Sequence, residues 1–201
     1  MPGPDPAPSA RREELLELAY RYVRDRGIAG LSLRPLAAEI GSSPRVLLFL
    51  FGSKDGLTRA LLARARADEL GFLDGMRSPD GSAPDGSAPD GLAGTGLRVW
   101  QWLADRSHRA VLTLWVEAYA RSLVEPDGPW ADYARQTVED WLRVLAAAQP
   151  ADERDTAAGA ARRTAVLAVL RGAMLDLLAT GDAARTTDAV RESLAMFQPA
   201  G

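Results

Sequence analysis

The chain has 201 residues, with 24 Lys and Arg against 27 Asp and Glu, a formal net charge of −3 and no Cys. That length suits one domain or two small ones, and 47% hydrophobic with 25% charged residues is typical of a soluble globular protein. The lack of Cys and the single His, His108, exclude disulfide scaffolds, thiol nucleophiles and two-His zinc sites. We therefore expect no enzyme, no catalytic residues, no metal site and no cofactor.

Neither a membrane span nor an export signal is predicted. No run of 18 apolar residues occurs. The opening MPGPDPAPSA lacks the basic start and the apolar segment of a secretory signal. A cytoplasmic protein without a membrane partner is expected.

Positive charge is concentrated near the N-terminus. Between Arg21 and Arg66, nine basic residues stand against three acidic ones, a local charge of +6 that leaves −9 for the rest of the chain. A basic block on an acidic chain indicates either a surface for a polyanion such as nucleic acid or a solvated helix face.

Four helices are predicted in the N-terminal third, after a Pro-rich tail (residues 1–8) that is expected to be disordered. Apolar residues at helical spacing, with Gly as the stop and Ser as the N-cap, set the helix boundaries. Pro44 directly after Ser43 is typical of the first helical position. The four predicted helices cover residues 9–27, 32–40, 44–51 and 54–76.

A low-complexity segment then interrupts the helices. Residues 78–91 read SPDGSAPDGSAPDG, a five-residue repeat that can bury almost nothing, so a flexible surface loop is expected over 77–92. Beyond it, apolar spacing and Pro or Gly breaks predict five more helices, over residues 93–105, 107–124, 128–148, 155–180 and 183–197. No segment favours a strand, so the expected fold class is all-α with about nine helices.

Two of these helices flank a tight turn at Gly41. Such a pair has helix-turn-helix geometry, in which the second helix enters the major groove of DNA. Short helices around a Gly also occur in many bundles, so the longer context matters. Residues 12–62, REELLELAYRYVRDRGIAGLSLRPLAAEIGSSPRVLLFLFGSKDGLTRALL, resemble the N-terminal domain of TetR-family transcriptional regulators. The resemblance is carried, in the family's order and spacing, by Gly27, Ser32, Arg34, Ala37, Gly41, Ser43, Leu47, Phe51, Ser53 and Lys54.

The resemblance implies a helix-turn-helix DNA-binding domain over residues 9–53 and a ligand-binding and dimerisation domain over 54–201. It implies that Lys54 contacts a DNA phosphate and that Arg34 contacts the backbone or a base; for both, ordinary solvation is the alternative. A Lys at a helix N-terminus opposes the helix dipole, a cost that bound phosphate would offset. Arg45 can pair bidentately with guanine. The expected DNA-binding residues are Arg34, Ser43, Pro44, Arg45, Val46, Leu48, Phe49 and Lys54.

The predicted recognition helix, PRVLLFLF, departs from the family pattern. The family usually has Thr at Val46, Tyr at Leu48, and Tyr or His at Leu50, so a phosphate-binding hydroxyl is missing. Either the basic residues carry more of the backbone contact or DNA binding is weaker. Three interpretations stay open for Val46, Leu48 and Phe49: contact with thymine methyl groups, completion of the core, or an exposed patch that binds protein.

Aromatic residues are concentrated in the C-terminal part. The helical spacing that starts at His108 predicts either a polar contact in a ligand pocket or a core stripe with a satisfied His. The Trp residues fit an aromatic pocket or a packed core equally well. The expected ligand-pocket residues are Trp100, His108, Leu112, Trp115, Tyr119 and Trp141. Adjacent carboxylates such as Glu139-Asp140 do not face each other on a helix and are expected to be solvated.

The last two predicted helices indicate a dimer. Residues 163–179, RTAVLAVLRGAMLDLLA, are apolar nearly all the way round, so this helix should be buried by its own domain and by another chain. Two helices from each chain would form a four-helix bundle about a two-fold axis. The expected interface residues are Leu167, Leu170, Met174, Leu178, Val190, Leu194 and Phe197.

Together these features predict a sequence-specific DNA-binding transcriptional regulator. By the resemblance, it is a homodimeric repressor that binds a palindromic double-stranded operator and is released by an unidentified small-molecule ligand. The alternative is a helical adaptor of the same fold that has lost specific DNA binding and binds protein through its apolar third helix. A helical enzyme is disfavoured by the single His and the missing phosphate-binding Gly loop.

Overall fold

A computed structural model describes residues 8–28, 30–75 and 91–197 of the chain. Across these ranges the protein has ten α-helices, one 3₁₀ turn and no strand, which confirms the all-α prediction. Helix packing divides the chain into two compact units. The first unit comprises residues 1–68 and 110–134, and the second unit comprises residues 69–109 and 135–201. The boundary after Asp68 falls inside a continuous helix, and the predicted division at residues 53 and 54 stays a prediction.

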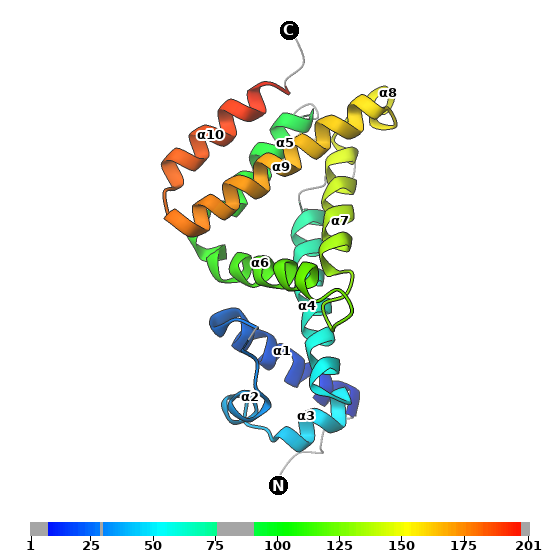
Figure 1. The fold of residues 1–201 in the computed structure, drawn as a ribbon, viewed down its shortest axis with the longest axis vertical. Helices are drawn as coiled ribbons and strands as arrows, with labels where there is room; N and C mark the ends of the chain where they lie inside the picture. Colours follow the sequence, from blue (N-terminus) through cyan, green and yellow to red (C-terminus); the bar gives the residue numbers. More distant parts are fainter. Residues whose placement is uncertain (1–7, 29, 76–90, 198–201) are drawn as a thin grey trace. The chain divides into compact units, whose positions relative to one another are not determined.

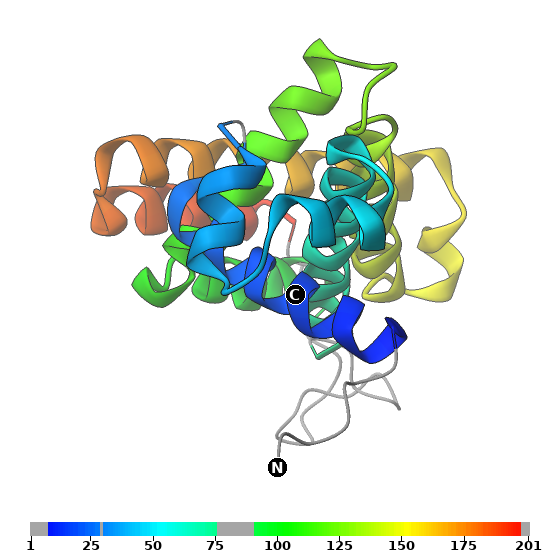
Figure 2. The ribbon, with the colours of Figure 1, turned by 90° about the horizontal axis from the view of Figure 1, so that it is seen from below.

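The first unit contains the predicted helix-turn-helix. Its helices are α1 (Pro8–Arg26), α2 (Leu33–Glu39), α3 (Pro44–Phe51), most of α4 (Lys54–Gly75) and most of α6 (Arg109–Val124). The helices α1, α2 and α3 pack against one another, and the chain passes from α3 directly into α4 (Figures 1 and 2). The buried side chains of this core include Leu15, Ala19, Val23, Leu36, Leu47 and Leu57. The expected tail (residues 1–8) ends inside α1, which begins at Pro8; residues 1–7 lie outside the described ranges.

Local signals set the ends of the short helices. The Ser43 hydroxyl accepts a hydrogen bond from the backbone N–H of Val46 at 3.2 Å, and Pro44 occupies the first turn of α3, as predicted. Gly41, in the turn before α3, has φ +64°, a conformation that favours glycine. Ser32 is the N-cap residue of α2, but its side chain makes no capping hydrogen bond, so that detail of the prediction is wrong.

The second unit is built around three helices that lie side by side: α5 (Gly91–Leu103), α9 (Ala157–Thr180) and α10 (Ala183–Ala195) (Figure 1). Trp100 is fully buried, and its indole N–H donates to the Thr187 hydroxyl at 3.0 Å. A Cβ built at Gly96 would lie 3.2 Å from side-chain atoms of both Val166 and Leu194. The absence of a side chain at Gly96 therefore permits the close approach of α5 to both neighbours.

The other elements of the second unit differ somewhat from the predictions. The helix expected over 128–148 is α7 (Tyr133–Ala147), and a short helix, α8 (Ala151–Arg154), was not predicted. A 3₁₀ turn over Arg106–His108 precedes α6, so His108 is not part of the helix expected over 107–124. The expected loop 77–92 lies mostly outside the described ranges, although its last two residues belong to α5. No helix in the described ranges is long and apolar enough to cross a membrane.

Candidate nucleic-acid interface

The short helix α3 has a buried side and an exposed side. Leu47 and Phe51 face the core of the first unit. Val46, Leu48 and Phe49 are exposed, and Phe49 has 82% of its surface accessible. The interpretation that these three residues complete the core is therefore wrong. An amphipathic helix normally exposes polar residues, so the apolar outer face of α3 requires a functional explanation.

Three basic side chains on α3 and on the helices before and after it in the chain are exposed to solvent: Arg34 on α2, Arg45 on α3 and Lys54 at the start of α4. None of them forms an ion pair with another residue in the described ranges. Their charges therefore remain available to a polyanion. Of the other predicted contact residues, Ser43 and Pro44 are half-buried, since Ser43 caps the helix.

The junction between α3 and α4 is sterically tight. Gly52 ends α3 with φ +78°, and the Ser53 hydroxyl accepts a hydrogen bond from the backbone N–H of Gly56 at 2.9 Å. A Cβ built at Gly56 would overlap the carbonyl oxygen of Phe51. The backbone at the end of α3 and the first turn of α4 therefore fit together only with Gly at position 56. The close approach of Gly56 to Phe51 sets the position of the first turn of α4, which carries Lys54, relative to α3. This role of Gly56 was not predicted from the sequence.

Polar contacts hold α1 to α4 within the first unit. The Tyr20 hydroxyl donates to the Asp68 carboxylate at 2.8 Å, and burial, followed by this hydrogen bond, raises the pKa of Tyr20. Arg64 on α4 donates to Asp68 at 2.5 Å and also forms an ion pair with Glu17 on α1. These contacts hold the first part of α4 against α1.

The residues predicted to line a ligand pocket belong to both units. Leu112 and Trp115 are buried on α6 in the first unit, and Tyr119 is half-buried on the same helix. Trp100 belongs to the core between α5 and α10. His108 and Trp141, by contrast, both lie in one aromatic cluster of the second unit.

That aromatic cluster contains four rings: Phe72 of α4, Trp102 of α5, His108 and Trp141 of α7. The Trp102 ring stacks on Phe72 at a centroid distance of 3.9 Å and on His108 at 3.8 Å. The Phe72 and Trp141 rings are 6.2 Å apart and tilted by 49°. The Trp141 indole N–H donates to the carboxylate of Glu69, one turn before Phe72. Glu69 and Phe72 were not predicted from the sequence, and Trp102 was grouped only with the other Trp residues that fit an aromatic pocket or a packed core.

Glu69 and Asp140 are two buried carboxylates beside these rings, each with 2% of its surface accessible. The expectation that Asp140 is solvated is therefore wrong: it faces the interior of the second unit and accepts a hydrogen bond from Arg143 at 2.8 Å. Burial raises the pKa of Glu69 to about 7; the hydrogen bond from Trp141 opposes this shift and the negative charge of Asp140 adds to it.

The predicted interface residues divide into two groups. Four of them, Leu167, Leu170, Val190 and Leu194, are buried in the core of their own unit, whereas Met174, Leu178 and Phe197 are half-buried. The exposed apolar and small residues of α9 instead form a stripe along the helix, the α9 outer face: Ala161, Thr164, Ala168, Gly172, Leu175 and Ala179. The helix is thus covered on one side within its own chain.

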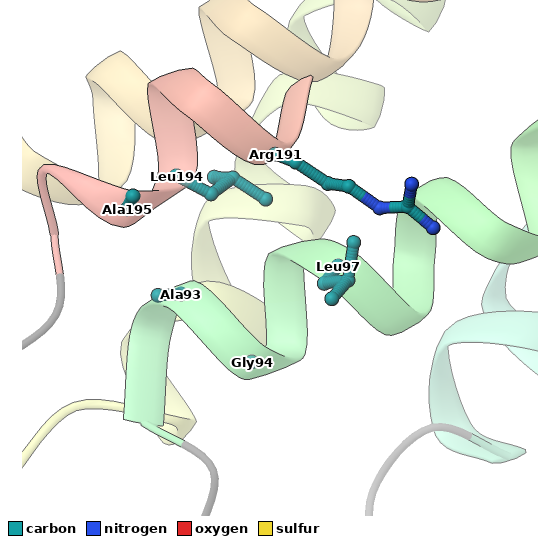
Figure 3. A pocket seen from close by; sticks show the side chains of 6 residues that line it. All are labelled: Ala93, Gly94, Leu97, Arg191, Leu194 and Ala195. Carbon is teal, nitrogen blue, oxygen red and sulfur yellow. The ribbon is translucent and has the colours of Figure 1, made fainter. Parts of the chain in front are cut away.

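A shallow hollow of about 190 Å³ lies between α5 and α10 (Figure 3). Its lining consists of Ala93, Gly94, Leu97, Arg191, Leu194 and Ala195. Ligand pockets usually enclose roughly 300–1,000 Å³, so this hollow is too small for a drug-sized molecule. It contains none of the predicted ligand-pocket residues.

Solved structures resemble almost the whole chain. A member of the TetR family from Streptomyces coelicolor A3 is 28% identical, with 94% of this chain and 99% of that chain covered and a TM-score of 0.69. The multidrug binding protein EbrR complexed with imidazole is 27% identical, with coverages of 98% and 93% and a TM-score of 0.68. A transcriptional regulator from Rhodococcus sp. Rha1 shares the fold at 19% identity, with coverages of 92% and 94% and a TM-score of 0.72. No protein-family model and no curated protein sequence matches the chain.

The all-α fold, the helix-turn-helix and these likenesses define a DNA-binding transcriptional regulator. Over almost its whole length the chain is similar to solved TetR-family regulators. Regulators of this family are not enzymes, and no observation favours the adaptor alternative.

Proposed function

We propose that the protein is a homodimeric repressor that binds a palindromic operator through α3 and leaves it when a small molecule binds the second unit. The observation that carries the DNA-binding part is the exposed face of α3, where Arg45 stands beside three accessible apolar side chains. The direct test is fluorescence anisotropy with labelled DNA from upstream of the protein's own gene. Specific binding at physiological salt supports the proposal, and equal affinity for any sequence contradicts it.

The two kinds of side chain on α3 suit two kinds of base contact. An Arg guanidinium pairs bidentately with the O6 and N7 atoms of guanine, and apolar side chains contact the thymine methyl group. We infer that Arg45 binds a guanine in each half-site and that Val46, Leu48 and Phe49 contact neighbouring thymines. Arg34 and Lys54, on either side of α3 in sequence, provide the phosphate contacts that fix its orientation.

An Arg45→Ala variant is expected to bind the operator about 5- to 150-fold more weakly, a loss of ~1–3 kcal/mol, and to tolerate substitution at one base position per half-site. Anisotropy titrations against a set of single-base operator variants measure both effects. Arg106→Ala removes the same charge from an exposed position in the second unit and serves as the matched control. Unchanged base preference in Arg45→Ala would exclude this residue from direct readout.

A Lys54→Ala variant is expected to behave differently, because a phosphate contact does not depend on sequence. Affinity should fall by a similar factor for operator and for unrelated DNA, and the slope of log K against log salt should become shallower by about 1 per half-site. A salt series from low to physiological concentration measures this slope. An unaltered slope would place Lys54 away from the phosphates.

The α9 outer face supports the dimer proposal. Its small residues permit two helices to approach closely, and Leu175, the largest apolar residue of this face, has 50% of its surface accessible. Met196, after α10, is exposed as well. A two-fold dimer would bring the same face of both chains together and give the paired recognition helices that a palindromic operator requires.

Ligand control is proposed for the second unit. EbrR, a relative of this chain, has been solved with imidazole and with proflavin, and the aromatic cluster offers flat surfaces of the kind that such molecules contact. The helix α4 contributes Lys54 to the first unit and Phe72 to the second. A ligand that displaces α4 would therefore alter the DNA-binding unit, provided that it binds the released state more tightly by the coupling free energy, typically ~1–3 kcal/mol.

A further inference from the structure

The helix α3 has little capacity to form hydrogen bonds with bases. Its sequence is PRVLLFLF, in which Arg45 carries the only polar side chain. The Ser43 hydroxyl, directly before the helix, already accepts the backbone N–H of Val46 as the N-cap. Hydrogen-bonded readout of a half-site by α3 therefore depends on one guanidinium, and any further discrimination between bases must come from apolar contacts.

The exposed apolar residues lie beside that guanidinium. Val46, Leu48 and Phe49 together form what we call the α3 apolar face. Leu48 and Phe49 follow Arg45 at i+3 and i+4, a spacing that separates Cβ atoms on a helix surface by about 5–6 Å. Adjacent base pairs are roughly 3.4 Å apart along the DNA axis. When Arg45 binds a guanine, the α3 apolar face is thus within reach of the next one or two base pairs.

The chemistry of this face determines which base feature it can recognise. In the major groove thymine presents its O4 acceptor and its C5-methyl group, and cytosine presents its N4 amino donor. Val, Leu and Phe side chains neither donate nor accept hydrogen bonds, so the face has no group with which to distinguish O4 from the N4 amino group. It can distinguish bases by the methyl group, which 5-methylcytosine carries at the same ring position as thymine.

We propose that the α3 apolar face recognises the C5-methyl group of a pyrimidine next to the guanine bound by Arg45, and that it accepts 5-methylcytosine in place of thymine. This inference rests on the proposed function, since it names the DNA chemistry that the recognition helix reads. Charge favours DNA over a protein as the occupant of the face: Arg34 and Lys54 are exposed on the adjoining helices, and the segment from Arg21 to Arg66 has nine basic residues against three acidic ones. Methylation of a cytosine at this position would therefore strengthen binding.

The test uses labelled duplexes of the DNA upstream of the protein's own gene, with single thymines replaced by uracil, a change that removes only the methyl group. At the sensitive position four base pairs are then compared by fluorescence anisotropy: T·A with U·A, and 5-methylcytosine·G with C·G. Loss of the methyl group is expected to weaken binding about fourfold per half-site in both comparisons, as for one buried methyl group. Changing both half-sites should weaken binding roughly 15-fold. Unchanged affinity for every uracil duplex would overturn the proposal.

Variants separate a direct contact from an effect of the methyl group on DNA shape. Phe49 is the most exposed residue of the face, so Phe49→Ala leaves the core intact and should reduce the methyl effect to less than about twofold. Leu123→Ala removes an exposed apolar side chain from α6 in the same unit and should keep the full effect. Because an effect on DNA shape does not depend on these side chains, a full methyl effect in both Phe49→Ala and Leu48→Ala would overturn the role of the face.

The same titrations distinguish failure of this inference from failure of the proposed function. Specific binding to the upstream DNA without any methyl effect would end the methyl proposal and leave the DNA-binding proposal intact. Equal affinity for any sequence would contradict the proposed function, and the methyl proposal would fall with it.

Discussion

A Leu175→Arg variant is expected to be a monomer that folds normally and binds the operator about 10²- to 10⁴-fold more weakly than the wild type. Leu175 has 50% of its surface accessible in the single chain, so the substitution leaves the core intact. In a two-fold dimer the same change occurs on both sides of the interface, and an unpaired charge buried there is strongly unfavourable. Each monomer then binds one half-site on its own, so the gain in affinity that comes from linking two half-site contacts is lost.

The matched control is Leu123→Arg. Leu123 lies on α6 in the first unit with 65% of its surface accessible, so it receives the same chemical change outside the α9 outer face. Light scattering at micromolar concentration should give a dimer for the wild type and for the control, and a mass near 21.5 kDa for Leu175→Arg. A dimeric Leu175→Arg, or a monomeric wild type, contradicts the proposed interface.

The outward-facing residues of α9 differ between the sequence-based prediction and the structure. The sequence pattern favours Met174 and Leu178 as outward-facing, because an apolar helix gives no polar face from which to fix its rotation. Both residues are half-buried in their own unit, and the exposed stripe instead runs through Ala168, Gly172 and Leu175. The apolar character of α9 on more than one side could be predicted from its composition. The rotation of α9 could not, since it depends on which side chains α5 and α10 present to it.

The helix-turn-helix was the most predictable part of the molecule. Gly stops, Ser caps and a Pro at the first helical position are local signals, and α2 and α3 follow them within a residue. The exposure of Phe49 was less certain, because an apolar residue on a short helix fits a core or a surface equally well. In the structure, α1 packs against α2 and α3, and this packing buries Leu47 and leaves Phe49 exposed.

The environment of Glu69 was largely hidden in the sequence. Its partners come from α4, α5 and α7, and only tertiary packing brings Trp102 and Trp141 to the same carboxylate-bearing helix. One local signal was present: Glu69 follows the buried residues Leu62 and Ala65 at helical spacing, so it interrupts an apolar stripe. A carboxylate in such a position is rarely buried without a partner. The same reasoning would have found Asp140, which sequence analysis assigned to solvent.

The second large effect is expected from a single methyl group at the junction between α3 and α4. In a Gly56→Ala variant the new Cβ would overlap the Phe51 carbonyl oxygen and lie 3.2 Å from the carbonyl carbon. Neither atom belongs to a flexible side chain, so the backbone must move. Overpacking of this kind typically costs ~1–3 kcal/mol, occasionally more. We expect a lower melting temperature and, because Lys54 and Arg45 lie on the two helices that must separate, a loss of operator affinity.

The same substitution at another position of α4, Gly71→Ala, is expected to have the opposite effect on stability. No atom outside the local helix lies within 4 Å of a Cβ built at Gly71, and the residue is exposed. Replacing a helical Gly by Ala at an open position stabilises a helix by roughly 0.5–1 kcal/mol. Thermal unfolding and operator titration of the two variants should therefore diverge: Gly56→Ala loses stability and affinity, and Gly71→Ala gains stability with operator affinity unchanged. Two variants of equal stability would show that the α3–α4 junction tolerates a side chain at position 56 and does not fix the position of the recognition helix.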